Sequence, residues 1–275
     1  MKKRVINRLP GQGAAAVLGL LPFLLLLFAY AWGSHVRLAE NPEDKLLPAM
    51  SSLVAAVDRV ALEPNRRTGE LQLWADTAAS LERLAIGLAF SALLALATGL
   101  ATGMVPYVRA ALAPFVRVLS MVPPMAILPI LFIVFGLGEL SKVVLIVLGI
   151  APCMMRDLQQ RVMELPSEQL IKAQTLGAHS GQILWRVVLP QTLPRLIDSL
   201  RLNLGPAFLF LIAAEAIAAE SGLGYRIFLV RRYLAMDTIL PYVIWITLLA
   251  FLTDLALRGV SRWAFPWFHQ GRERA

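Results

Sequence analysis

Side chains that could bind a metal ion or act in catalysis occur in this chain without the spacing that such chemistry needs. His35, His179 and His269 are scattered, and no His-Glu-x-x-His or other metal-ligand spacing occurs. Cys153 is the only cysteine, which excludes a disulfide within the chain. No lysine follows a glycine, which excludes a phosphate-binding loop ending in Gly-Lys-Ser or Gly-Lys-Thr. The sequence therefore predicts no catalytic residue, no metal site and no cofactor bound by this chain.

Charged side chains within apolar stretches offer a second kind of chemistry. Glu215 lies in Ala-Ala-Glu-Ala-Ile-Ala-Ala, where an ionised carboxylate is costly and normally faces a cavity or a partner. Two interpretations stay open for it: a position in a polar path or gate, and a structural hydrogen bond to a neighbouring helix. Asp198 and Arg201 are three residues apart, close enough to pair on one helix face. With Asp254 and Arg83, they are interpreted as anchors near helix ends.

The elements that position these residues are predicted to be membrane-spanning helices. Of the 275 residues, 58% are hydrophobic and 16% are charged. The mean hydropathy of +0.67 is too high for a soluble domain. A bilayer core needs about 20 apolar residues for each helical crossing, which leaves no room for a soluble ATPase domain as well. We expect an all-α, multi-pass membrane protein with six crossings, at 14–32, 77–104, 115–136, 140–157, 197–219 and 238–260.

Three prolines predict a break in the third crossing. Pro123, Pro124 and Pro129 lie within its apolar run, and each removes an amide donor and clashes with the preceding turn. A break in lipid would leave backbone polar groups unsatisfied, so this stretch should face protein or a wet cavity. Together with Met121 and Met125, these prolines form a candidate pathway wall. The alternative is a kink that only shapes packing.

Basic residues predict the topology. The net charge of +8 comes mostly from residues that flank apolar runs, an arrangement that indicates orientation in a membrane and not nucleic-acid binding. Their positions predict that the N-terminus (1–13), a loop (158–196) and the C-terminal tail (264–275) are cytoplasmic. The mixed-charge stretch 33–76 is predicted to be external, with a short amphipathic helix over Leu46–Val60. Residues 77–263 then form a five-helix core.

Three further patterns leave alternatives open. Ala29-Tyr30-Ala31 is similar to a signal-peptide cleavage site, but the apolar run before it is long, which favours an uncleaved helix. A small-residue stripe permits close helix approach, within the chain or at a homodimer seam: Ala95, Gly99 and Gly103. A cluster before the sixth crossing could anchor the chain at the membrane surface, meet a docked protein or guide an anion: Tyr225, Arg231 and Arg232.

The loop between the fourth and fifth crossings has a pattern of its own. Ser167 and the residues up to 176 form a predicted helix, which Gly177 is well placed to end in a left-handed conformation. A second short helix is predicted over 180–188, and Pro190 should stop it. Two short helices joined by a glycine bend would present a compact knob. The alternative from the pattern alone is an interfacial helical hairpin that covers the bundle.

This loop resembles the coupling motif of binding-protein-dependent ABC importer permeases. In that motif Glu-Ala-Ala is followed by three residues, Gly, nine residues, an aliphatic residue, any residue, Leu and Pro. Ala173 falls on the second alanine, while Ile171 and Lys172 replace the leading Glu and Ala. The rest of the motif is matched by Gly177, Val187, Leu189 and Pro190.

Other segments are similar to the nitrate/sulfonate/taurine group of these permeases. They include Asn41-Pro42, Pro123–Pro129, Phe135–Lys142, Thr175–Ala178 and Gly222–Tyr225, and the resemblance covers about residues 41–263. Glu215 lies seven positions before Gly222, which matches a glutamate that precedes Gly-Leu-Gly in the family.

The resemblance implies the type I ABC importer permease fold in a bacterial inner membrane, with both termini cytoplasmic. It also implies a permease homodimer, a periplasmic or lipid-anchored substrate-binding protein, and a dimeric ABC ATPase that uses ATP and Mg. The solute would be a small anion such as nitrate, a sulfonate or taurine. The residues that would contact or shape the ATPase-coupling knob are Ala173, Leu176, Gly177, Ala178, His179, Val187, Leu189 and Pro190.

The alternative function is a secondary transporter or channel that needs no ATPase. Such carriers often show repeat symmetry, and the broken-helix pattern of the third crossing has no second copy in this chain. An intramembrane enzyme is a third interpretation, and it lacks a recognisable catalytic constellation.

Overall fold

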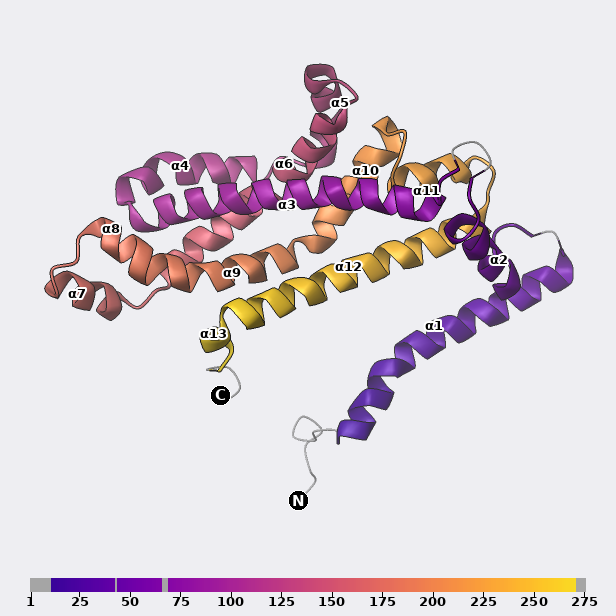
Figure 1. Ribbon diagram of the computed structural model, residues 1–275, viewed down its shortest axis with the longest axis horizontal. Coiled ribbons are helices and arrows are strands. Elements are labelled where there is room, and N and C mark those ends of the chain that lie inside the picture. Colours follow the sequence, from indigo (N-terminus) through magenta and orange to yellow (C-terminus); the bar gives the residue numbers. More distant parts are fainter. Residues whose placement is uncertain (1–10, 43, 66–68, 271–275) are drawn as a thin grey trace. The chain divides into compact units, whose positions relative to one another are not determined.

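The chain is described by a computed structural model that covers residues 11–42, 44–65 and 69–270. Regular structure in these ranges is helical, as the all-α prediction requires, and Figure 1 shows the order of the helices along the chain. The chain divides into two units, 11–63 with 230–241 and 64–229 with 242–270. The basic residues of 1–10, 66–67 and 271–275, used above to predict topology, lie outside the described residues.

The first unit contains α1 (Gln12–Glu40) and α2 (Met50–Ala61). α1 covers the predicted crossing 14–32 and continues without a break past Ala29-Tyr30-Ala31. Most of its large apolar side chains are exposed, as expected of a helix that faces lipid. α2 begins later than the amphipathic helix predicted over Leu46–Val60, and it buries Leu53, Ala56 and Val60 along one face.

Polar contacts join α1 to the segment that follows it. The Tyr30 hydroxyl donates to the Pro48 carbonyl at 2.7 Å, and the Ser34 hydroxyl donates to the Leu47 carbonyl at 3.0 Å. The Arg37 side chain donates to the Asp44 carboxylate. This hydrogen bond, with a second one from the Leu46 amide, holds the pKa of the Asp44 carboxyl below its ordinary value.

In the second unit, α3 (Gln72–Met104) packs along α6 (Glu139–Met163), and Figure 1 shows how they run together. The contact is close because small residues line α3. A Cβ added at Gly99 would lie 2.6 Å from Leu158 Cβ, and one at Gly103 would lie 2.5 Å from Val162 Cβ. Ala95, in the same stripe, is fully buried. Of the two interpretations of the stripe, the structure therefore supports close packing within the chain.

The predicted third crossing, 115–136, is interrupted, as its prolines led us to expect. The structure divides it between α4 (Pro106–Leu119) and α5 (Pro124–Phe135), whose axes differ by 95°. The break falls before Pro123 and Pro124, where the missing amide donors and the proline rings prevent a continuous helix. The predicted interruption is thus present, and it is sharper than a kink.

The remaining helices are α9 (Leu189–Leu202), α10 (Leu204–Ala218), α11 (Leu223–Arg231), α12 (Met236–Ala264) and α13 (Pro266–Gln270). The predicted fifth crossing is bent by 49° at the break between α9 and α10, and α12 covers the sixth. By length and composition, three described helices can cross a membrane, or up to five if each bent pair is one crossing. The count of six stays a prediction.

Candidate functional site

The loop 167–190 forms a knob with the predicted bend. α7 (Ser167–Thr175) ends just before Gly177, whose φ of +81° is the left-handed conformation expected there. The Gly177 amide donates to the Gln174 carbonyl at 2.9 Å, and the Ala178 amide donates to the Ala173 carbonyl at 3.0 Å. These bonds satisfy carbonyl groups at the end of α7, so the turn is fixed by backbone geometry.

The second half of the knob differs from the prediction at Pro190. α8 (Ser180–Ile183) continues through a π-helical segment, Leu184–Val188, directly into α9. Pro190 does not stop the helix; it directly follows a π-helical segment, whose wider turn changes the backbone hydrogen-bond spacing just before the proline. The wider turn before it is closed by the Leu189 amide, which donates to the Leu184 carbonyl five residues back.

His179 caps α8, a role that the sequence analysis did not assign. Its backbone amide donates to Gln182 Oε1 at 3.1 Å, and the Gln182 amide donates to His179 Nδ1 at 3.4 Å. This reciprocal pair is a capping box. His-x-x-Gln was visible in the sequence, but histidine is not among the usual capping residues.

The knob is packed onto the ends of the long helices. Val162 of α6, Ile183 of α8 and Val188 form a buried cluster. The hydrophobic side chains packed against this cluster come from α3, the turn after α6, α7, the bend and the π-helical segment: Leu100, Met104, Leu165, Leu170, Ala173, Ala178 and Val187. The Gln191 side-chain amide also donates to Gln169 Oε1 at 3.0 Å, which joins α9 to α7. The knob is thereby attached to three helices at once.

The predicted coupling residues divide into two sets. Ala173, Ala178 and Val187 pack inward with the buried cluster, and Leu189 and Pro190 are half-buried at the start of α9. The outer set is exposed: Leu176, Gly177 and His179. Leu176 has an exposed fraction of 87%, and Trp185, which the sequence analysis did not select, has 68%. A lone tryptophan in a polar loop was the signal that could have found it.

Glu215 lies in the centre of a buried polar cluster. Its carboxylate is fully buried and accepts from Arg83 Nη1 at 2.7 Å, from Ser80 Oγ at 2.7 Å and from the Gly224 amide at 2.8 Å. These contacts connect α3, α10 and α11. They supply the structural partner that one of the two interpretations of Glu215 required. A role in a pathway or gate stays a prediction.

The Gly-Leu-Gly sequence after Glu215 fits around this carboxylate. Gly222 has a φ of +123°, and a Cβ there would lie 2.5 Å from Glu215 Cδ and 2.7 Å from Arg83 Nη1. A Cβ at Gly224 would lie 2.6 Å from the Ile212 carbonyl oxygen. Glycine is needed at both positions because the backbone passes directly against the ion pair and α10.

Arg83 joins further residues that the sequence analysis did not connect. Its guanidinium also binds Glu139, at the start of α6, and the Ser221 carbonyl at 2.8 Å. Lys142 Nζ lies 2.8 Å from the Glu139 carboxylate, and both cations are buried. Arg83 is therefore a link between helices, and its predicted role as an anchor near a helix end stays a prediction. Partners so far apart in sequence leave no local signal.

The other predicted path residues differ from Glu215 in burial. Met121 and Met125 have exposed fractions of 69% and 44%, Pro123 and Pro129 are exposed, and Pro124 is half-buried. Their place in a transport path stays a prediction. The residues predicted as a possible contact for a docked protein are divided between the two units. Tyr225 lies in one unit, and the exposed Arg231 and Arg232 lie in the other.

Residues 87–266 match the model of the family described as "Binding-protein-dependent transport system inner membrane component". The chain belongs to this family. The predicted family is thereby confirmed, and the chain is a permease subunit of an ABC transporter, a multi-pass membrane protein that acts in transport and not as an enzyme.

Similar proteins indicate the group within the family to which the permease is related. The taurine transport system permease protein TauC of Escherichia coli (strain K12) is 41% identical over 196 residues, which are 71% of this chain and 71% of TauC. The putative aliphatic sulfonates transport permease protein SsuC of Bacillus subtilis (strain 168) is 29% identical over 68% of each chain. These similarities confirm the nitrate/sulfonate/taurine type.

A solved structure supports the fold of the permease. An inward-facing structure of the MetNI methionine ABC transporter aligns with a TM-score of 0.59 and 19% sequence identity. The alignment covers 78% of this chain and 96% of the other. The type I importer permease fold predicted from the resemblance is confirmed by this likeness.

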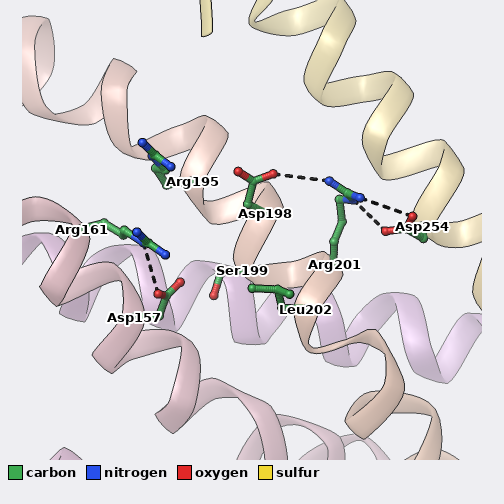
Figure 2. A pocket seen from close by; sticks show the side chains of 8 residues that line it. All are labelled: Asp157, Arg161, Arg195, Asp198, Ser199, Arg201, Leu202 and Asp254. Carbon is green, nitrogen blue, oxygen red and sulfur yellow. Dashed lines mark hydrogen bonds and ion pairs between the residues drawn. The ribbon is translucent and has the colours of Figure 1, made fainter. Parts of the chain in front are cut away.

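A polar cavity of about 300 Å³ lies between α6, α9 and α12 of the permease, and Figure 2 shows the side chains around it. Arg201 Nε lies 2.7 Å from Asp254 Oδ1, and Arg201 Nη1 lies 3.5 Å from Asp198 Oδ1. The predicted Asp198–Arg201 pair is therefore present. Asp254 joins it from another helix, which the sequence analysis did not predict.

Proposed function

We propose that this permease carries a small sulfonate-bearing solute inward across the bacterial inner membrane, driven by a separate ABC ATPase that binds the knob 167–188. The observation that carries this proposal is that the knob exposes two large apolar side chains, Leu176 and Trp185, while its base packs against the long helices. Exposed apolar side chains rimmed by polar residues are typical of protein contact sites. In this proposal the knob and both termini are cytoplasmic.

The attachment of the knob supports its use as a lever. Ile183 and Val188 pack on α3 and α6, and α8 runs into α9 without a break. A movement of the knob would therefore move the ends of three helices together. Events at the ATPase and at the solute path become linked because both bias the same two-state bundle.

The proposed cycle follows from the family resemblance. ATP and Mg close the ATPase dimer, the two knobs of a permease homodimer move together, and the path opens outward to a docked binding protein. ATP hydrolysis then returns the path to its inward-open state. Met121–Pro129 and Glu215 are proposed to line or gate this path, and Tyr225, Arg231 and Arg232 to meet the binding protein.

The substrate class rests on the relatives. TauC is named for taurine and SsuC for aliphatic sulfonates, and a sulfonate group is common to both. We extend this chemistry to the permease because TauC is 41% identical over most of both chains.

Transport in proteoliposomes tests the function. The permease is reconstituted with its ATPase and binding protein, and uptake of labelled taurine is measured with ATP inside the vesicles. Uptake should require ATP and cease with a catalytically inactive ATPase. Uptake that persists without the ATPase would establish the alternative, a secondary transporter or channel.

A variant at the bend tests the knob. Gly177→Pro removes the left-handed residue and its amide donor, so the knob should lose its shape while the rest of the chain inserts normally. ATP turnover should continue without taurine uptake. Gly11→Pro provides a matched control, because Gly11 precedes α1 with a φ of −62°, a value that proline adopts. Normal coupled uptake by Gly177→Pro would contradict the role given to the knob.

A further inference from the structure

The polar cavity between α6, α9 and α12 has one neutralised wall. In Figure 2 this wall is the group Arg201, Asp254 and Asp198. Arg201 is held by both carboxylates, and Asp254 also accepts from Arg258 Nη2 at 2.9 Å. The cations and anions on this side are matched to one another, so the wall is already satisfied without a ligand.

The opposite wall holds two arginines, one of which makes no ion pair within the described residues. Arg161 and Arg195 lie there with a single lining carboxylate, Asp157. The ion pairs of Arg161 with Asp157 and Glu164 are both long, at 3.4 Å. Arg195 makes no ion pair with any residue of the described part of the chain, and its guanidinium lies 4.8 Å from the centre of the Phe268 ring. Stacking on an aromatic face leaves guanidinium N–H groups available to an acceptor.

Between the two walls lies a buried hydroxyl group without a partner. Ser199 lines the cavity, and its exposed fraction is 1%. Among the described residues, Ser199 Oγ has no hydrogen-bond partner. Other buried hydroxyls in this unit, such as Ser91 and Thr192, donate to a carbonyl one turn back in their own helix. A buried hydroxyl without a partner, in a cavity that also holds the Arg195 guanidinium with no ion pair among the described residues, suits an oxygen-rich anion.

We propose that this cavity binds a small oxyanion, a sulfonate in the transported solute, through Ser199 Oγ, Arg195 and Arg161. Asp157, whose ion pair with Arg161 is long at 3.4 Å, lines the same cavity, so a cationic amino group on the same small molecule would find a carboxylate. The cavity therefore favours an amino-sulfonate over a plain sulfonate. The identity of the solute rests on the proposed function; the oxyanion chemistry rests on the cavity.

Binding to the permease alone tests the inference, without ATPase or binding protein. The purified full-length chain is placed in phosphatidylcholine nanodiscs, and titration calorimetry measures the Kd of taurine, ethanesulfonate and ethanolamine. Taurine should bind more tightly than ethanesulfonate, and ethanolamine should not bind. Ser199→Ala should weaken taurine binding by about tenfold or more, because a hydrogen bond to a charged group is lost. Ser91→Ala, at a buried serine outside the cavity, should leave the Kd unchanged.

The empty protein provides a second readout. Ser199→Ala removes an unsatisfied polar atom, so the Tm without ligand should stay the same or rise. A purely structural role for the hydroxyl predicts a fall. Arg195→Gln is the second binding variant and should also weaken taurine binding about tenfold, with Arg117→Gln, an exposed position elsewhere, as its control.

The phosphate of an anionic lipid carries the same oxyanion chemistry, and the nanodisc composition separates the two sources. If phosphatidylglycerol raises the Tm in a Ser199-dependent way while taurine does not bind, the cavity is a lipid site and the solute proposal is overturned. Taurine binding that Ser199→Ala and Arg195→Gln leave unchanged overturns it too. Absence of taurine binding beside normal ATP-driven uptake refutes this inference alone, whereas Ser199-dependent binding beside ATPase-independent uptake refutes only the proposed function.

Discussion

At the scale of single residues, the Glu215–Arg83 pair shows how a charge is accommodated in an apolar helix. The carboxylate receives hydrogen bonds from a guanidinium and a hydroxyl of α3 and from a backbone amide of α11. Removing one partner of such a pair costs far more than the pair contributes, because the other charge stays buried. Glu215 is therefore a sensitive position for stability as well as for transport.

Glu215→Gln separates these two roles. The variant leaves Arg83 with Glu139 as its remaining carboxylate partner, so we expect a loss of about 3–5 kcal/mol in the free energy of unfolding. Thermal unfolding in detergent measures it, and Glu220→Gln, an exposed glutamate, should change little. Uptake per folded molecule is then compared. Unchanged uptake would remove Glu215 from the proposed gate, and unchanged stability would contradict the structural account.

At the scale of elements, α3 and α6 pack closely because α3 carries small residues where the two helices meet. Small residues recur along the α3 stripe, and the side chains of Leu158 and Val162 on α6 occupy the space beside Gly99 and Gly103. Without a hydrophobic driving force between helices in lipid, close van der Waals packing of this kind stabilises their association.

Gly99→Ala should reverse the usual effect of replacing glycine in a helix. Alanine normally stabilises a helix interior by about 0.5–1 kcal/mol relative to glycine. At Gly99 the new Cβ would lie 2.6 Å from Leu158 Cβ, so we expect destabilisation of about 1–3 kcal/mol instead. Gly259→Ala in α12 meets no atom within 4 Å and should show the usual gain. A higher Tm for Gly99→Ala than for the parent would contradict the packing described.

The elements differ in how far sequence could predict them. The end of α7 was predictable because a left-handed glycine is a local property, and Gly177 has that conformation. The continuation of α8 through Pro190 was not, because it depends on a π-helical segment and on packing against α3 and α6. The partners of Glu215 were equally hidden, since Ser80 and Arg83 are more than a hundred residues away.

At the scale of the whole molecule, the permease family follows from motifs, whereas the number of crossings does not follow from hydropathy. α5 is only 12 residues long, and no composition rule tells whether it completes a crossing begun by α4. The exposed knob has the complementary property. Its inner face packs within this chain, whereas Leu176 and Trp185 are exposed and form the proposed contact with the ATPase.

The affinity of the ATPase for permease variants tests whether these exposed side chains form the contact. Trp185→Ala should weaken binding of the ATPase to the permease by about 30-fold or more, as expected when a tryptophan anchor is truncated. Leu176→Ala should have a smaller effect in the same direction. The control is Trp263→Ala, because Trp263 is 86% exposed but lies at the end of α12. Equal ATPase affinity for Trp185→Ala and Trp263→Ala would show that these exposed side chains of the knob are not the contact.

The unbroken passage from α8 through the π-helical segment into α9 has a mechanical consequence. At about 1.5 Å per residue, the stretch from Ser180 to Leu202 is a continuous helical segment roughly 35 Å long, and the first break along it is the 49° bend before α10. If the ATPase moves the knob, a continuous helix passes that movement to its other end. The first break at which the direction of the movement could change is at Asn203. In the proposed cycle, a shift of α9 along its axis would therefore become a rotation of α10 at Asn203 and not at the knob.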